Sequence, residues 1–140
     1  MVIYTEGLYN LGMVYVRMDD MERALYYFNL CLEKARSIGD RIMQGKCVSY
    51  MSCCYGFMNN LKMAKYYFEM QRTLPHENEN MKQYFMLYNG GLTSFLEGKQ
   101  DAALRQFHLA IDCVQRHRLD KKYLQSVYGI MVYIQLYKKN

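Results

Sequence analysis

The stretch LYNLGMVY, residues 8–15, is followed by two aspartates at 19–20 and then by ALYYFNLC at 24–31. This order of an apolar segment, a two-residue break and a second segment that begins with alanine returns twice. The later copies are VSYMSCCY (48–55) with Asn59-Asn60 and AKYYFEMQ (64–71), and LYNGGLTS (87–94) with Gly98-Lys99 and ALRQFHLA (103–110). The copies are spaced by forty and then thirty-nine residues. A fixed period in this range is typical of stacked helical hairpins, each too small to bury its apolar face alone.

Hydrophobic spacing inside the copies predicts helices. Leu8, Leu11, Tyr15 and Met18 recur at steps of three and four residues, so we expect them on one helical face. The breaks between segments are rich in Asp, Asn and Gly, which favour turns and helix caps, and Pro75 cannot continue a helix. We therefore predict seven helices, over residues 4–18, 21–37, 41–58, 61–73, a fifth that follows the polar connector 76–80 and ends at 97, then 100–116 and 120–137.

Composition places the chain among folded proteins. It has 140 residues, 51% of them apolar, and one proline, which suits one ordinary domain and excludes a disordered chain. Its five cysteines show neither a CxxC pair nor the spacing of a zinc site, so we expect small core residues in a reducing, cytoplasmic compartment. No apolar run reaches the length of a membrane span, and nothing near the start resembles a signal peptide, so we expect no membrane partner.

Positive charge is concentrated towards the end of the chain. Residues 104–140 hold seven Lys or Arg and two Asp or Glu, a balance of +5 that equals the net charge of the whole chain. Such an end suits an acidic partner or nucleic acid. Basic residues near helix C-termini also interact favourably with the helix dipole, so we expect no direct binding of nucleic acid.

The chemistry of an enzyme site is missing from the pattern. The three histidines, His76, His108 and His117, are not part of any recognisable Ser/His/Asp or Cys/His arrangement. The Asp19-Asp20 pair is best interpreted as a hairpin turn, because its counterparts Asn59-Asn60 and Gly98-Lys99 share only turn chemistry. There is no glycine-rich phosphate loop. The sequence therefore predicts a protein that is not an enzyme and has no cofactor and no metal.

The recurring residues resemble the tetratricopeptide repeat over essentially the whole chain. The first copy matches through Leu8, Leu11, Gly12, Tyr15, Ala24 and Phe28, with Cys31 in the last alanine position. The third matches through Leu87, Gly91, Ala103, Phe107 and Ala110 and departs at Gly90 and Ser94. The second is weaker, since Ser52 replaces glycine and Gln71 replaces alanine. The resemblance implies an all-α, right-handed superhelical solenoid of antiparallel helix pairs, with three and a half repeats over 5–40, 45–77, 84–117 and 120–138 in a single domain.

The step of 39–40 residues is longer than the usual 34 of this family. It is similar to the long-repeat branch of kinesin light chains, Rap-type peptide receptors and maltose-regulator-type activators. This similarity implies a non-catalytic module that binds a protein or peptide segment in a concave groove. It also implies an alternative, a ligand- or peptide-sensing regulatory domain of a larger transcription or signalling regulator that acts through dimerisation. A purely structural role in assembly is a third hypothesis.

The resemblance also implies which residues line the groove, because the first helix of each hairpin faces it in this family. The expected residues are Glu6, Tyr9, Asn10, Met13, Arg17, Lys46, Ser49, Tyr50, Cys53, Phe57, Phe85, Tyr88, Asn89, Leu92, Leu96, Leu124, Tyr128, Met131 and Gln135. Tyr, Phe and Met suit an apolar or amphipathic peptide. Asn10 and Asn89 hold equivalent positions. Two interpretations stay open: their amides bind extended peptide backbone, or Tyr-Asn is simply common at this point of the repeat. The carboxylate clamp of chaperone-binding repeats is absent, since Tyr9 and Met13 stand in its first two positions.

The last predicted helix, 120–137, has little polar face between Ile130 and Tyr137. Terminal helices of solenoids normally carry a polar outer face. Two interpretations stay open. Either the chain is a piece of a longer array, or residues 124–137 bury their free side against a second copy and form a homodimer.

Overall fold

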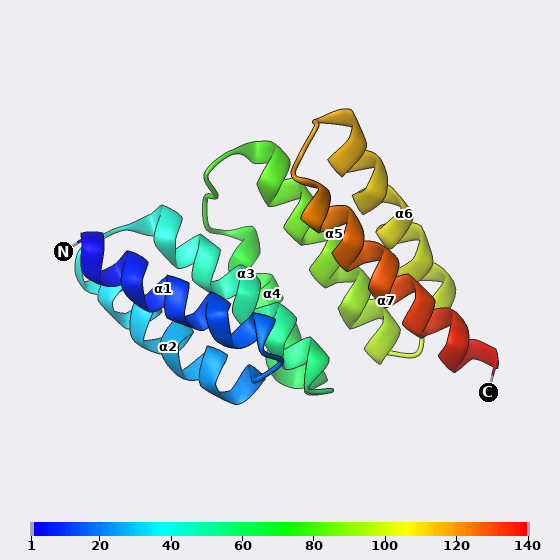
Figure 1. Ribbon diagram of the computed structural model, residues 1–140, viewed down its shortest axis with the longest axis horizontal. Coiled ribbons are helices and arrows are strands. Elements are labelled where there is room, and N and C mark those ends of the chain that lie inside the picture. The colour runs from blue at the N-terminus through cyan, green and yellow to red at the C-terminus, as the bar shows by residue number, and fades with distance from the viewer. Residues whose placement is uncertain (1, 140) are drawn as a thin grey trace. The chain divides into compact units, whose positions relative to one another are not determined.

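The computed structural model describes the backbone of residues 2–139 and the side chains of residues 4–136 (Figure 1). Within this range the chain forms seven helices and no strand, which confirms the predicted all-α class. The helices are α1 (Val2–Arg17), α2 (Met21–Ser37), α3 (Arg41–Phe57), α4 (Leu61–Arg72), α5 (Glu79–Leu96), α6 (Gln100–Arg116) and α7 (Lys121–Lys139). The predicted ends lie within two residues of the observed ones, but α5 begins inside the stretch expected to be a connector.

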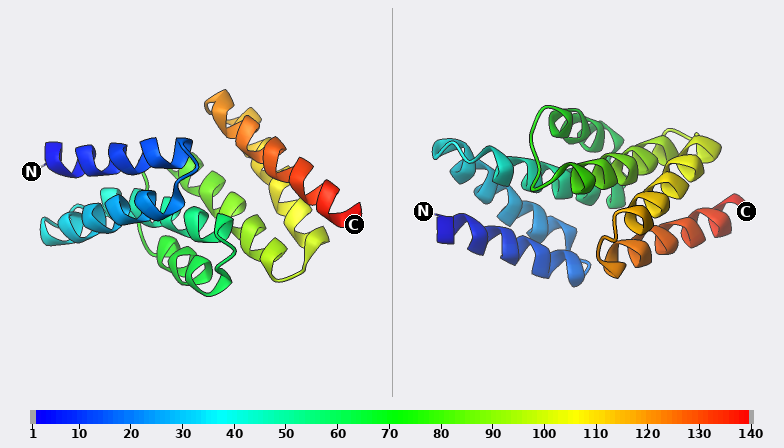
Figure 2. Two further views of the ribbon diagram at one scale, coloured as in Figure 1. Left: turned by 60° about the horizontal axis from the view of Figure 1, so that its bottom comes forward. Right: turned by 90° about the horizontal axis from the view of Figure 1, so that it is seen from above.

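The chain divides into two compact units. The N-terminal unit ends at Glu77 and contains α1–α4, and the C-terminal unit begins at Asn78 and contains α5–α7. In each unit every helix packs against the one that follows it, so that consecutive helices run antiparallel (Figure 2). The packed helix pairs agree with the predicted hairpins. The single domain and its repeat boundaries stay a prediction.

Turns and caps follow directly from the short breaks in the sequence. Asp19, Asn59 and Gly98 adopt the left-handed conformation after the first helix of each hairpin, with φ of 60°, 60° and 84°. Gly39 and Arg118 adopt it after α2 and α6. Asp20, Asp40, Asn60 and Asn78 then cap α2, α3, α4 and α5, each accepting a hydrogen bond from the backbone N–H three residues on. Local side chains therefore end and restart the helices without help from distant residues.

The helix α6 lacks such a cap, because Lys99 precedes it and makes no side-chain cap bond. We expect Lys99→Asp to raise the free energy of unfolding by about 1 kcal/mol. The carboxylate would accept a hydrogen bond from a backbone N–H of the first turn and interact favourably with the positive end of the helix dipole. Urea unfolding followed by far-ultraviolet circular dichroism measures this change. Lys99→Asn is the matched control for charge and should keep most of the gain. An unchanged midpoint in both variants would contradict the capping argument.

Glycine and phenylalanine set how closely the helices of a hairpin approach. A Cβ added to Gly12 would lie 2.6 Å from the ring of Phe28, and one added to Gly91 would lie 2.7 Å from the ring of Phe107. Both rings are completely buried. In the second hairpin Ser52 takes the glycine position, and its hydroxyl donates to the carbonyl oxygen of Ala64 at 2.9 Å. Phe68, the counterpart of the two rings, is only half-buried.

The helical face predicted from the spacing of Leu8, Leu11, Tyr15 and Met18 is only partly buried. Leu8 is buried, but Leu11 and Met18, expected on the same face, are exposed. A step of three residues falls about 60° short of a full turn, so Leu11 lies to one side of Leu8 on the helix surface. The helix α2 covers α1 on the side of Leu8 and Gly12. In α3, which packs against both α2 and α4, the counterpart Met51 is fully buried.

Candidate functional site

Three aromatic rings from α1, α2 and α3 meet in the N-terminal unit. The ring centroids of Tyr9 and Tyr50 are 6.0 Å apart with an interplanar angle of 73°. Each also lies 5.8 Å from the ring of Phe28. Phe28 is completely buried, whereas Tyr9 and Tyr50 are half-buried. The buried ring thus supports two tyrosines that keep part of their surface towards solvent.

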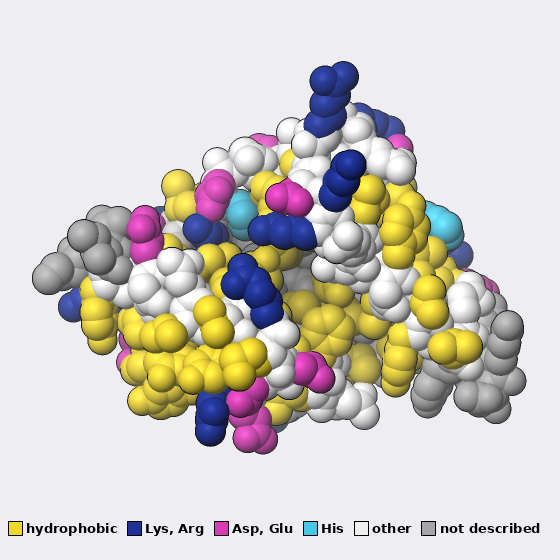
Figure 3. Space-filling model, in the orientation of Figure 1, with side chains coloured by type: hydrophobic (Ala, Val, Ile, Leu, Met, Phe, Trp, Pro, Cys, Tyr) yellow, Lys and Arg dark blue, Asp and Glu magenta, His cyan; other side chains and the backbone are white. Residues whose placement is uncertain are grey.

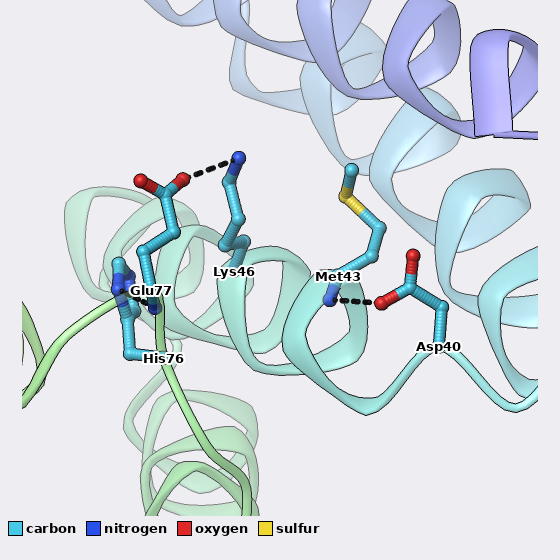
Figure 4. Close-up of polar contacts among 5 residues, drawn as sticks. All are labelled: Asp40, Met43, Lys46, His76 and Glu77. Atoms are coloured by element: carbon cyan, nitrogen blue, oxygen red, sulfur yellow. Dashed lines mark hydrogen bonds and ion pairs between the residues drawn. The ribbon is translucent and has the colours of Figure 1, made fainter.

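A lysine side chain lies beside this aromatic group. The Nζ atom of Lys46 is 4.6 Å from the centroid of the Tyr9 ring, within the range of a cation–π interaction. The same atom lies 2.7 Å from Oε1 of Glu77 (Figure 4). Only 20% of the Lys46 side chain is exposed. The cation is therefore held between a ring and a carboxylate at one end of the α1–α3 face, defined here as Tyr9, Met13, Lys46, Tyr50 and Cys53.

The neighbouring Lys46 shifts the pKa of the Glu77 carboxyl group. The hydrogen bond from Lys46 holds the pKa of Glu77 below its usual range, against the opposing effect of partial burial. A depressed carboxyl pKa stabilises the folded chain above the unfolded pKa, and this contribution is lost as the pH falls through the folded pKa. Because the Glu77 side chain is half-exposed, water screens the pair and the contribution is small.

Backbone contacts hold the segment that carries Glu77 against α3. A Cβ on Gly45 would overlap the carbonyl oxygen of Pro75, so only glycine allows this approach. Arg41 donates from Nη2 to the carbonyl oxygen of Thr73 at 3.0 Å. The N–H of Glu77 donates to Nδ1 of His76 at 2.8 Å (Figure 4). Residues 73–77, in the observed connector between α4 and α5, therefore run along α3 and bring Glu77 to Lys46.

The other expected groove residues of α1 and α3 have different environments. Met13 and Cys53 are half-buried, and Glu6, Asn10, Arg17 and Phe57 are exposed. Ser49 is buried, and its hydroxyl donates to the carbonyl oxygen of Gly45 at 2.9 Å, so it faces the interior. The structure thus brings Tyr9, Met13, Lys46, Tyr50 and Cys53 to one partly open face.

The cysteines are all free thiols in the described chain. Burial raises the pKa of Cys54 to about 12 and also raises the pKa of Cys53. A hydrogen bond with Cys31 raises the pKa of Cys47, and Cys31 donates to the carbonyl oxygen of Thr5 at 3.2 Å. The thiols of Cys47, Cys53 and Cys54 are therefore neutral near pH 7 and are poor nucleophiles.

The expected groove positions of α5 lie in the interior. Phe85, Tyr88, Asn89 and Leu92 are all buried, and Leu96 is half-buried. Asn89 is only 1% exposed, whereas Asn10 at the equivalent repeat position is exposed. In α7, Leu124 and Met131 are half-buried, while Tyr128 and Gln135 are exposed.

An aromatic cluster occupies this part of the C-terminal unit, and two of its members, Tyr84 and Tyr123, are not among the expected groove residues. The rings of Tyr84 and Tyr123 are 4.8 Å apart, and the Tyr84 hydroxyl donates to the Tyr123 carbonyl oxygen at 3.2 Å. Phe85 and Tyr88 pack against Tyr84 at 5.2 and 5.9 Å. The thirty-nine-residue spacing of Tyr84 and Tyr123 equals the repeat period and could have indicated this contact. No sequence signal points to the pair of Lys46 and Glu77.

The described residues offer neither a metal-binding cluster nor a membrane-spanning helix. There is no group of three or more His, Cys, Asp or Glu side chains arranged to hold a metal ion. None of the helices in the described part of the chain is long and apolar enough to cross a membrane. Comparison with known proteins gave no match to a family model, to a curated protein or to a solved structure.

Proposed function

We propose that this chain is a non-catalytic binding module of the tetratricopeptide type, and that a protein or peptide segment binds across the α1–α3 face. The proposal includes the right-handed superhelical arrangement that the repeat pattern implies. The observation that carries it is the pair of half-buried tyrosines, Tyr9 and Tyr50, which buried Phe28 supports. The cation of Lys46 lies over the ring of Tyr9.

The chemistry of this face defines the kind of segment it would bind. Tyrosines offer large contact areas at low entropic cost, because their rings have few rotatable bonds. Tyr9 and Tyr50 suit an apolar or aromatic side chain of the ligand. Lys46 suits an acidic side chain, which would take the place of the Glu77 carboxylate. The exposed amide of Asn10 on α1 is available to the ligand backbone. The favoured ligand is therefore an extended segment with an aromatic residue near an acidic one.

Selection of a phage-displayed library of random linear peptides on the chain tests this proposal. We expect selected peptides to be rich in aromatic and acidic residues, and calorimetric titration should show binding about tenfold weaker for Tyr50→Leu and for Lys46→Met, or about 1.4 kcal/mol each. Leucine keeps an apolar contact with Phe28, so the fold should persist. Tyr66→Leu is the matched control, because Tyr66 is an exposed tyrosine on α4 outside this face. Equal affinity for the parent chain and both variants would exclude the α1–α3 face.

Variants of Tyr88 or Asn89 are poor tests of binding, although the sequence favours them. The Tyr88 ring is buried and lies 5.7 Å from the Phe107 ring. Its removal would leave a cavity beside Phe107 and lower the stability of the C-terminal unit. A loss of binding in Tyr88→Ala would therefore not distinguish a ligand contact from damage to the core.

A regulatory role is the second candidate. A sensor that acts through dimerisation needs surfaces for self-association, and exposed apolar faces on α1 and α7 favour this role. We place either function in the cytoplasm, because the cysteines are free and a reducing compartment keeps them so.

A further inference from the structure

The outer side of α1 carries a row of exposed apolar side chains. Tyr4, Leu11, Val14 and Met18 are 42–64% exposed, and hydrophobic side chains gather over α1 in Figure 3. Together with Gly7 they are spaced by three, four, three and four residues. This spacing is the seam by which two helices pack side by side at about 20°. The row is defined here as the α1 outer face, and it lies on the opposite side of α1 from Tyr9 and Met13.

The next hairpin shows what such a face is built to hold. The counterparts of Gly7, Leu11 and Val14 in α3 are Cys47, Met51 and Cys54. These three side chains are at most 1% exposed, and α3 packs against α2 as well as α4. In α1 the same positions are left open. The α1 outer face therefore has the pattern of a surface that a further helix covers.

The glycine in this face has no structural reason within the described chain. A Cβ on Gly12 or Gly91 would collide with a phenylalanine ring, and one on Gly45 with the backbone of Pro75. A Cβ on Gly7 would meet nothing within 4 Å. Glycine inside a helix costs about 1 kcal/mol relative to alanine, and here it leaves a hollow that fits a large side chain of another helix.

The helix α7 presents a second face of the same kind. Tyr128, Val132, Tyr133 and Leu136 are 48–60% exposed, whereas Val127 and Ile134 on its other side are completely buried. Gly129 lies among the exposed residues, and a Cβ there would again meet nothing within 4 Å. At 1.5 Å per residue the 16 residues of α1 and the 19 of α7 span about 24 and about 28 Å. This α7 outer face matches the α1 outer face in length and character.

Charge selects which faces would meet. Residues 17–23, at the end of α1 and the start of α2, hold Arg17, Asp19, Asp20, Glu22 and Arg23, a balance of −1. Residues 118–122, at the start of α7, hold Arg118, Asp120, Lys121 and Lys122, a balance of +2. An antiparallel pair of α1 and α7 brings these opposite charges together. An antiparallel pair of two α1 helices would instead place Asp19 near the Glu6 end of its partner. Two α7 helices would bring together ends that are both basic in sequence. Like charges at a contact are unfavourable.

We infer that the α1 outer face of one chain packs antiparallel against the α7 outer face of a second copy. Large side chains of each helix fill the hollow at the glycine of the other, and the acidic and basic ends lie side by side. Because each chain carries both faces, the contact either closes reciprocally into a dimer or extends into a longer chain of copies. The contact leaves the α1–α3 face open.

Sedimentation velocity on the chain and two charge-introducing variants tests this contact. Leu11→Arg places a charge only in the α1 outer face, and Val132→Arg places one only in the α7 outer face. We expect the parent to sediment above the monomer mass at high concentration, and each variant alone to be monomeric. An equimolar mixture should restore a complex of one chain of each, because the intact α7 face of the first variant meets the intact α1 face of the second.

Other outcomes overturn the inference. A parent that stays monomeric at all concentrations excludes self-association, and a variant that still dimerises alone shows pairing of like faces. A mixture without a complex also contradicts the α1–α7 contact. Met18→Arg and Leu136→Arg repeat the design at two further exposed positions, and circular dichroism verifies that every variant is helical. Tyr26→Arg on α2 is the control for added charge outside both faces and should assemble like the parent.

Discussion

Gly45→Ala is expected to lower the free energy of unfolding by about 3 kcal/mol, at the upper end of the cost of overpacking a tight contact. The added Cβ would overlap the carbonyl oxygen of Pro75 and lie 3.2 Å from its carbonyl carbon. Both atoms belong to the backbone, and buried Leu74 lies only 3.5 Å away, so no flexible side chain can move aside. The connector must shift away from α3, with loss of the bond from Arg41 to Thr73. Urea unfolding followed by circular dichroism measures the effect.

Gly7→Ala is the matched control for this substitution. Gly7 is also inside a helix, but a Cβ there meets nothing within 4 Å. Measured at a concentration where the chain is monomeric, Gly7→Ala should raise the free energy of unfolding by up to about 1 kcal/mol, since alanine favours helix. If Gly45→Ala were as stable as the parent, the close approach of the connector to α3 would be wrong.

Phe28→Ala is expected to lower the free energy of unfolding of the N-terminal unit by about 4 kcal/mol. The Phe28 ring is completely buried, packs on the Gly12 backbone and supports Tyr9 and Tyr50. Its removal leaves a cavity that α1 and α2 cannot close without losing these ring contacts. The chain has no tryptophan, so guanidinium unfolding is best followed by far-ultraviolet circular dichroism.

Phe68→Ala provides the comparison at the same repeat position. Phe68 is half-buried, so its loss should cost about 1 kcal/mol, in proportion to the apolar area that it removes from water. Phe107→Ala, completely buried in the C-terminal unit, should behave like Phe28→Ala. Equal losses for Phe28 and Phe68 would contradict the difference in burial between the first and second hairpins.

Only part of the candidate site was predictable from the sequence. The family resemblance placed Tyr9 and Tyr50 among the groove residues of α1 and α3, and their ring centroids lie 6.0 Å apart. The same resemblance placed Tyr88 and Asn89 in the groove, but both are buried. A helical pattern states which residues share a face, whereas burial depends on what packs against that face, and this is not encoded at a fixed distance along the chain.

The sequence by itself determined the seven helices and the turns between them. These features depend on residues near one another in the chain, such as Asp40 and the backbone N–H of Met43 that it caps. Only the tertiary structure decided that Glu77 meets Lys46, and that Leu11 is exposed where its counterpart Met51 is buried. The physical reason is that burial and charge pairing depend on the number and path of neighbouring segments: Met51 has a helix on either side, and the connector carries Glu77 along α3 to Lys46.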